Sequence, residues 1–184
     1  MHPYEMGTTM RARHKDDSIK LNYGSLYTVV EALQRHGLIE AQETEREGKR
    51  PERTVFRITP TGSAELLDWL SELISVPEKE YLRFEAGLSQ LPVLTPSQAA
   101  ELLEIRCQHL EVDLEQRRTV HRLVTEQGVP RLFVVEHEYM TALVEAELEW
   151  TRKLVGEVKS KSLEGSELWQ DFHASKSSEK GKPT

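Results

Sequence analysis

The sequence predicts a mainly α-helical protein with one small β-hairpin in its N-terminal third. Apolar residues recur at helical spacing through four segments, residues 24–36, 59–74, 96–127 and 131–159. Residues 38–58 change instead to the two-residue alternation of strands, around a turn rich in glycine and proline. Hydrophobic residues make up 38% of the 184-residue chain and charged residues 30%. That balance suits helices with wide solvated faces that bury their remaining apolar surface against a second copy.

Two helices are expected before the hairpin. Residues 2–14 predict a short helix because a proline suits its first turn. This first helix ends at Asp16, Asp17 and Ser18. A second helix begins at a cap formed by Asn22 or Gly24 and ends at Gly37. One buried face of the second helix carries Leu26, Val29, Val30 and Leu33. The core is expected to hold Leu26, Val30, Leu33, Leu38 and Ile39.

The hairpin consists of a strand over residues 38–42 that continues as a polar arm, a turn over residues 47–52 and a second strand over residues 53–58. Its tip is basic. A third helix follows, capped by residues 59–62 and running to about Ile74. The apolar face of this helix carries Leu66, Leu67, Trp69, Leu70, Leu73 and Ile74.

The second half of the chain predicts a helical domain. A short helix covers residues 82–91, and a long one covers residues 96–127. The long helix places Leu103, Leu110 and Val124 in a series of seven-residue steps, with Arg117 as its odd polar member. Cys107, Leu114 and His121 lie four residues after members of this series. A further helix over residues 131–159 is expected to line one face with Phe133, Met140, Leu143, Trp150 and Leu154.

The order helix, tight link, helix, hairpin, helix is that of a winged helix-turn-helix, in which the second helix enters the major groove of DNA. We therefore predict a winged helix-turn-helix DNA-binding domain over residues 1–75 and an α-helical dimerisation domain over residues 76–160. Residues 161–184 are expected to be a polar, disordered tail, although aromatic residues near 169 could make a late contact.

The charge distribution permits contact with DNA. The whole chain has a net charge of −7, but residues 1–62 hold ten basic and nine acidic side chains, a net +1. The remaining residues hold 14 basic and 22 acidic side chains, a net −8. The acidity therefore belongs to the second half, and the first half can meet a phosphate backbone.

The predicted DNA contacts lie at the start of the second helix and around the hairpin tip. Small or hydroxyl-bearing side chains at a helix start can approach base edges, and nearby basic residues can bind phosphates. The predicted contacts are Lys20, Tyr23, Ser25, Tyr27, Thr28, Lys49, Arg50 and Arg53. An ordinary helix start and solvated hairpin charges are the alternatives for these residues.

Three runs of sequence carry a family resemblance. They are HPYEM at residues 2–6, YGSLYTVVEALQRHGLI at residues 23–39 and FRITPTG at residues 56–62. Together, in this order, they resemble the PadR family of transcriptional repressors. The resemblance covers residues 1–75 closely and the rest only as a helical pattern. It implies a winged helix-turn-helix reading head and a helical dimerisation domain.

The start of the chain departs from that family. PadR proteins normally begin with an apolar helix just before the HPYE motif, whereas this sequence starts at the motif itself. Either the start codon lies further upstream, or the domain lacks this helix. Its absence would remove a face that packs on the third helix and on the dimer partner.

Other kinds of site find little support. Trp69 and Trp150 are expected to pack in the core or the dimer, and an aromatic effector pocket, implied by the resemblance, is the alternative. A zinc site would need three or four ligands. The candidate pairs are Cys107 with His109 and His121 with His137, and each supplies only two. Cys107 is expected to be a small buried hydrophobe. We expect no metal, no cofactor and no enzymatic activity, because no catalytic constellation can be assembled.

The sequence therefore predicts a homodimeric repressor that binds double-stranded operator DNA as an inverted repeat. The resemblance implies release of the DNA by a small effector, such as a phenolic acid or another aromatic compound. A winged-helix module that binds protein rather than DNA is the alternative, and a small-molecule carrier is a third. No stretch reaches the roughly 20 apolar residues of a membrane span, and no signal peptide is recognised. A cytoplasmic location is expected, which suits a single cysteine.

Overall fold

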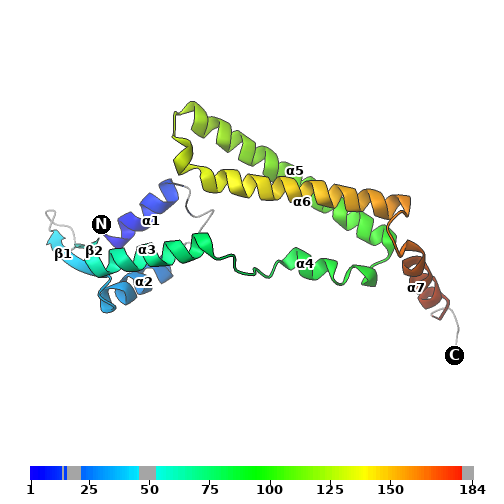
Figure 1. Cartoon of the computed structure of the whole chain (residues 1–184), viewed down its shortest axis with the longest axis horizontal. Helices are drawn as coiled ribbons and strands as arrows, with labels where there is room; N and C mark the ends of the chain where they lie inside the picture. Colours follow the sequence, from blue (N-terminus) through cyan, green and yellow to red (C-terminus); the bar gives the residue numbers. More distant parts are fainter. Residues whose placement is uncertain (14, 16–21, 46–52, 180–184) are drawn as a thin grey trace. The chain divides into compact units, whose positions relative to one another are not determined.

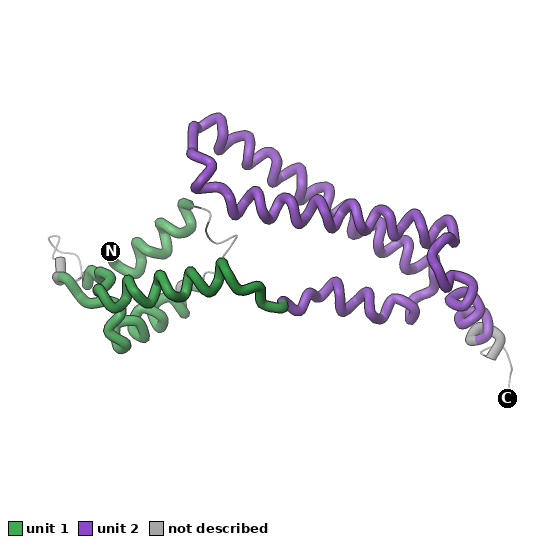
Figure 2. The backbone as a smooth tube through the Cα atoms, in the orientation of Figure 1, with its two compact units in different colours: residues 1–79 green, residues 80–184 purple. Residues whose placement is uncertain are grey.

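The computed structural model describes residues 1–13, 15, 22–45 and 53–179 (Figure 1). The chain divides into two compact units, Met1–Lys79 and Glu80–Thr184 (Figure 2). The elements of the first unit are α1 (Pro3–Ala12), α2 (Tyr23–Arg35), β1 (Ile39–Glu45), β2 (Arg53–Ile58) and α3 (Pro60–Ser75). The elements of the second unit are α4 (Arg83–Leu88), η1 (Leu91–Val93), α5 (Pro96–Glu126), η2 (Arg131–Phe133), α6 (Val135–Ser160) and α7 (Ser166–Glu179). The mainly helical fold with a two-stranded wing is confirmed.

The start of α1 is fixed by a capping box. The Nδ1 atom of His2 accepts a hydrogen bond from the backbone N–H of Tyr4, at 3.1 Å. The backbone N–H of His2 in turn donates to Glu5 Oε2, also at 3.1 Å. These two bonds satisfy N–H groups that a helix start leaves without partners. The HPYE run therefore encodes a helix start by its own side chains.

The second helix has a narrower buried face than the sequence predicts. Val30 is buried, and Leu26 and Leu33 are half-buried, but Val29 is 50% exposed, so its assignment to the buried face is wrong. The helix α2 packs against α1 and β1. A narrow stripe of apolar side chains on α2 is enough to contact both elements. Leu38 and Ile39, also expected in the core, are half-buried.

The wing is an antiparallel pair of strands. Ile39 lies opposite Ile58, and Ala41 lies opposite Phe56, with an irregularity between Ala41 and Glu43. Met1 extends the pairing, because its N-terminal ammonium donates to the Phe56 carbonyl at 2.8 Å and the Phe56 N–H donates to the Met1 carbonyl at 3.1 Å. The first residue of the chain therefore lies beside β2.

Two glycines are required where α2, the wing and α3 meet. Gly37 follows α2 with a φ of 70°, in the left-handed region that favours glycine. Gly62, in the first turn of α3, is buried, and a Cβ atom there would lie 2.0 Å from the Leu38 carbonyl oxygen. The glycine therefore lets the first turn of α3 pass close to the link between α2 and β1.

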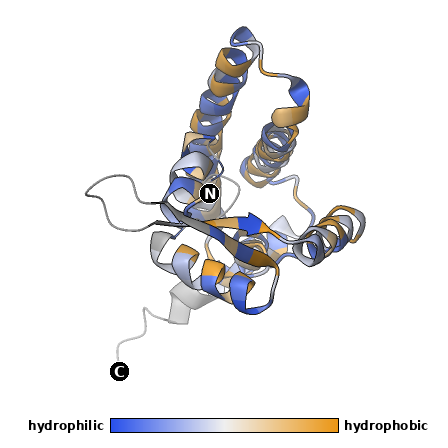
Figure 3. Ribbon diagram, turned by 90° about the vertical axis from the view of Figure 1, so that its left-hand side faces the viewer, coloured by the Kyte–Doolittle hydropathy of each residue, from blue (hydrophilic) through white to orange (hydrophobic). Residues whose placement is uncertain are grey.

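The apolar face of α3 is exposed. Its large side chains are between 39% and 84% exposed: Leu66, Leu67, Trp69, Leu70, Leu73 and Ile74. In Figure 3, which colours the ribbon by hydropathy, hydrophobic and hydrophilic segments alternate along the helices. Among the described residues of the first unit, the close contacts of α3 lie at its first turn. Within the first unit alone, none of these six side chains is buried.

The core of the second unit lies between α5 and α6. From α5 it takes residues at alternating three- and four-residue spacing, namely Ala100, Leu103, Cys107, Leu110 and Leu114. From α6 it takes Val144, Leu148, Thr151, Val155 and Val158, which alternate in the same way, together with Leu154. This spacing is that of a coiled-coil seam, so the seven-residue pattern predicted for α5 is confirmed over its first half.

Ion pairs between the two helices follow the same repeat. Glu104 pairs with Lys159, Glu111 Oε1 with Arg152 Nη2 at 2.7 Å, and Arg118 Nη2 with Glu145 Oε1 at 3.0 Å. Seven residues forward along α5 match seven residues back along α6, so the helices run antiparallel. Because these pairs are exposed, each contributes little, and the apolar seam supplies most of the stability.

The face predicted for residues 131–159 is wrong. Of its five members, the structure buries Leu154, whereas Phe133, Met140, Leu143 and Trp150 are exposed. The antiparallel register with α5 turns Val144, Leu148, Thr151, Val155 and Val158 inward instead. The larger side chains are left on the outer face of α6.

The disordered tail predicted from residue 161 is also wrong for much of its length. Residues Ser166–Glu179 form α7. Lys161, in a left-handed conformation, ends α6, and Trp169 packs against the core cluster. The Trp169 Nε1–H donates to the Leu94 carbonyl at 2.8 Å. Burial of one aromatic side chain and its hydrogen bond orders the segment.

Candidate nucleic-acid interface

The N-terminus of α2 is capped but carries no acidic side chain in its first turn. Asn22 Oδ1 accepts a hydrogen bond from the Gly24 N–H at 2.9 Å, so Asn22 is the cap and the choice between Asn22 and Gly24 is settled. The aligned peptide dipoles place a partial positive charge at this end. With no carboxylate in that turn to neutralise it, the helix start can attract a phosphate.

Ser25 is exposed, and its hydroxyl proton is already engaged. Its Oγ donates to the Asn22 carbonyl at 2.8 Å. A serine hydroxyl has one proton and two lone pairs. Toward a ligand, Ser25 in this geometry therefore presents an acceptor, which matches an amino group on a base edge.

Gly24, Tyr27 and Thr28 complete the exposed surface of the first turns of α2. Tyr27 is 46% exposed, with room to pack its ring and offer its hydroxyl outward. A Cβ atom at Gly24 would lie 3.3 Å from Asn22 Oδ1, closer than most such contacts. Glycine at this position therefore leaves the Asn22 side chain free to cap the helix, and it leaves the backbone beside that cap exposed.

The remaining predicted DNA contacts are described only in part. Lys20, Lys49 and Arg50 lie outside the described residues. Tyr23 is the first residue of α2 and Arg53 the first residue of β2, and the structure places their backbones only. The structure thus brings Ser25, Tyr27 and Thr28 together on one helix start, and DNA contact by all eight residues stays a prediction.

Two residues at the base of the wing were not predicted as part of the site. Arg57 Nε pairs with Glu40 Oε1 at 2.7 Å across the two strands. Thr59 Oγ1 lies 2.8 Å from the Gly37 carbonyl oxygen and accepts from the Gly62 N–H at 3.0 Å. The first contact ties the two strands of the wing together, and the second ties the end of β2 to the link that follows α2. The sequence marks Thr59 as a helix cap but carries no signal for its bond to a residue 22 positions earlier.

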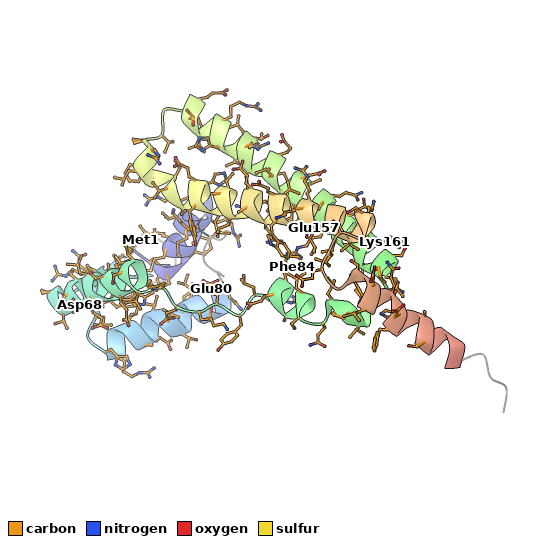
Figure 4. The ribbon with its side chains drawn as sticks, turned by 45° about the vertical axis from the view of Figure 1, so that its right-hand side comes forward. Met1, Asp68, Glu80, Phe84, Glu157 and Lys161 are labelled. Atoms are coloured by element: carbon orange, nitrogen blue, oxygen red, sulfur yellow. The ribbon has the colours of Figure 1, made fainter. Side chains whose placement is uncertain are left out.

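The two predicted effector residues lie in different units and are described separately. Trp69, on α3, is 55% exposed. Trp150, on α6, is 49% exposed and meets the ring of Phe84 edge-on, with centroids 6.2 Å apart. The Arg106 guanidinium lies 3.7 Å from the centroid of that same ring, and Figure 4 labels Phe84 on α4. An aromatic and cationic cluster therefore surrounds Phe84.

The second unit holds a stacked pair of histidines and the single cysteine. His121 and His137 stack with ring centroids 6.4 Å apart, and His137 Nε2 lies 2.9 Å from the Arg117 carbonyl oxygen. Within the described ranges, no three His, Cys, Asp or Glu side chains converge. Cys107 is buried as predicted, and burial raises the pKa of its thiol, although Arg152 acts in the opposite direction. No described helix is long and apolar enough to cross a membrane.

Comparison with protein families gives one result. A family model described as the transcriptional regulator PadR-like family matches residues 1–68. That range covers both helices of the helix-turn-helix, the wing and the first half of α3. A comparison with curated protein sequences gives no match.

Solved structures resemble the whole chain. Bacillus subtilis PadR in complex with operator DNA is 14% identical, with a TM-score of 0.72 over 86% of this chain and 91% of that one. The same protein in complex with p-coumaric acid is 15% identical, with a TM-score of 0.65 over 86% and 90%. The PadR-like transcriptional regulator BC1756 from Bacillus cereus is 16% identical, with a TM-score of 0.58 over 88% and 91%. At these identities the likeness establishes the fold.

Proposed function

We propose that the chain, whose residues 1–68 match the model of the transcriptional regulator PadR-like family, is a sequence-specific DNA-binding repressor. The observation that carries the proposal is the start of α2. It combines a cap, no acidic residue in the first turn and three exposed hydroxyl-bearing side chains, Ser25, Tyr27 and Thr28. These features suit a helix that enters the major groove with its first turns.

Each of these side chains has a distinct role in this proposal. Ser25 accepts a hydrogen bond from a base amino group, because its proton is held by the Asn22 carbonyl. Thr28 offers a methyl group to a thymine methyl, and Tyr27 offers its hydroxyl. The basic residues Lys20, Lys49, Arg50 and Arg53 bind phosphates and position the helix without specifying sequence.

The repressor is proposed to act as a homodimer through the second unit. Four large apolar side chains of α5 are each about half exposed, namely Leu102, Ile105, Val112 and Leu123. They recur at multiples of seven residues, as Leu102 with Leu123 and Ile105 with Val112, and the polar residues His109, Gln116 and Thr119 occupy the other positions of these two series. Exposed apolar side chains that gather on one helix mark an interaction surface. A second copy covers it, and two reading heads then contact an inverted repeat with half-sites about one helical turn apart.

We further propose that a small aromatic effector releases the DNA. The cluster around Phe84 supports this, because the half-exposed Trp150 offers an aromatic surface that suits a planar ring. The Arg106 guanidinium, which lies over the Phe84 ring and pairs with Glu147, adds a cation to the cluster. A neighbour in fold was solved with p-coumaric acid. Trp69, on α3, is the second candidate contact. An effector that favours a dimer with mismatched reading heads would lower operator affinity.

The test is a titration of the purified full chain with the promoter DNA beside its own gene. We expect salt-dependent binding at nanomolar concentrations, in the usual range for specific regulators. Ser25→Ala weakens it, and Ser71→Ala, a matched change on the exposed surface of α3, does not. Light scattering should report the same dimer for all three proteins. Absence of salt-dependent binding by the wild-type chain, or unchanged affinity in Ser25→Ala, would overturn this assignment.

One observation favours the alternative, a module that binds another protein. The helix α3 carries three acidic residues, Glu65, Asp68 and Glu72, and no basic one, beside its exposed apolar face. Such a surface suits a partner with a basic-rimmed apolar groove. In that case the titration with promoter DNA shows no binding, whereas replacing Leu67 and Leu73 with serine abolishes binding of the partner.

A further inference from the structure

We propose that Thr59 is the positioning residue that joins α3 to the recognition helix α2 and the wing, so that the second unit controls DNA reading through this side chain. The inference rests on the proposed function. It concerns a residue that is not itself expected to contact DNA.

The side chain and the backbone N–H of Thr59 make hydrogen bonds with three other residues. Its Oγ1–H faces two carbonyl oxygens, that of Gly37 at 2.8 Å and that of Leu38 at 3.2 Å. The same oxygen accepts the Gly62 N–H at 3.0 Å, and the Thr59 backbone N–H donates to the Leu38 carbonyl at 3.0 Å. Donor and acceptor capacities of the hydroxyl are both used.

The ends of four elements meet at these contacts. The helix α2 ends at Arg35, and β1 begins at Ile39, so the two carbonyls lie in the link between them. The strand β2 ends at Ile58, which pairs with Ile39, and α3 begins one residue after Thr59. Close approach of Gly62 to the Leu38 carbonyl leaves little room for α3 to shift along this link.

The helix α3 is the chain's route from the reading head to the second unit. At 16 residues it spans roughly 24 Å, and residues 76–82 connect it to α4. The described hydrogen bonds and the closest backbone approach that tie its start to the link after α2 are those of Thr59 and Gly62. A change in the direction of α3 therefore acts on α2 and the wing through Thr59 and Gly62.

Helix capping alone does not require all of these bonds. An N-cap needs an acceptor for the Gly62 N–H, whereas the hydrogen bonds to Gly37 and Leu38 require a donor. Three substitutions separate the two roles. Thr59→Ser keeps both, Thr59→Asp keeps the acceptor and loses the donor, and Thr59→Val loses both. Thr61→Asp and Thr61→Val, on the exposed side of the same turn, control for charge and shape.

The experiment measures the affinity of the full-length variants for the same promoter DNA, with thermal unfolding alongside. We expect Thr59→Ser to bind within about twofold of wild type, and Thr59→Asp and Thr59→Val to bind about two- to tenfold more weakly, as loss of hydrogen bonds implies. Footprints should show reduced protection by the wing. Both Thr61 variants should bind like wild type. If Thr59→Asp binds like wild type, Thr59 is a cap only and the inference is overturned.

Hydrogen exchange in the absence of DNA tests the joint independently of the proposed function. Loss of the donor should accelerate exchange of the amides of Leu38 and Ile39 in Thr59→Asp and Thr59→Val alike. Unchanged exchange in Thr59→Asp contradicts the joint whether or not DNA binds. Failure of the wild-type chain to bind DNA, with exchange changed as expected, contradicts the proposed function and leaves the joint supported.

Discussion

The indole N–H of Trp169 donates a 2.8 Å hydrogen bond to the carbonyl oxygen of Leu94, which lies 75 residues earlier in the chain. Next to it, His173 Nε2 lies 3.0 Å from the Pro92 carbonyl oxygen. Both acceptors belong to the link between α4 and α5. The C-terminal helix α7 is thus held to the start of the longest helix of the unit by two side chains of its own.

Trp169→Phe should lower the stability of the second unit, because the Leu94 carbonyl loses its side-chain donor while the ring remains. A loss of about 1 kcal/mol is expected, or a few degrees in the midpoint of thermal unfolding. Leu168→Ala, at a neighbouring and mostly exposed position, should change the midpoint by less. Equal effects of the two substitutions would show that α7 contributes no specific contact.

Gly62→Ala should be among the most destabilising single changes in the first unit. The added Cβ would lie 2.0 Å from the Leu38 carbonyl oxygen and 2.8 Å from its carbon, both backbone atoms. Because neither atom can move without shifting β1, we expect a loss of more than about 2 kcal/mol. Gly87→Ala, at a site on α4 with open space around it, is the control and should be neutral or slightly stabilising. Denaturant unfolding measures both, and a tolerated Gly62→Ala would contradict the close crossing.

Leu148→Ala tests which face of α6 is buried. Leu148 is 4% exposed in the seam with α5, and removal of a buried leucine side chain costs roughly 2–5 kcal/mol. Leu143→Ala, on the outer face, should cost far less in the unfolding of the isolated unit. The reverse order of the two effects, measured by urea unfolding at low protein concentration, would restore the face predicted from the sequence.

The local parts of the fold could be predicted because their signals are local. Asn22 as a cap, Gly37 as a helix end and the strand 53–58 depend on residues within a few positions of one another. The buried face of α6 could not be predicted in the same way. Its apolar residues fill more than one stripe, and the choice between stripes is set by the antiparallel register with α5.

In the candidate site, too, the local features could be predicted and the long-range contacts could not. Ser25 and Thr28 could be placed at the start of a recognition helix from the motif around them, and the structure positions them on one exposed turn. The joint at Thr59 could not be predicted, because its partner carbonyls lie 21 and 22 residues away, across the hairpin. The hydrogen bond of Trp169 to the Leu94 carbonyl could not be predicted for the same reason, because these two residues lie even further apart in the sequence.

The ion pair of Arg131 with Glu138 predicts a pH-dependent change at the tip of the α5–α6 hairpin. The side-chain hydrogen bonds from Arg131, at 2.9 and 3.0 Å, lower the pKa of Glu138, and His121 acts in the same direction. A carboxyl whose pKa is lowered on folding stabilises the folded state above its unfolded pKa, and this contribution is lost as the pH falls through the folded value. Arg131→Gln should return the pKa of Glu138 toward the usual range of glutamate. Titration of its side-chain carboxyl by NMR measures this, and an unchanged pKa would show that the pair does not form in solution.

Arg50→Ala separates positioning from sequence reading. If Arg50 binds a phosphate, the substitution should weaken binding to promoter DNA and to unrelated DNA by similar factors. It should also reduce the slope of log affinity against log salt concentration by about 0.9. Ser25→Ala should do the opposite, weakening binding to the promoter more than to unrelated DNA and leaving the slope unchanged. Fluorescence anisotropy at several salt concentrations with both DNA sequences measures these quantities. A loss confined to the promoter in Arg50→Ala would make Arg50 a reader of bases, and the wing rather than the start of α2 would then carry part of the specificity.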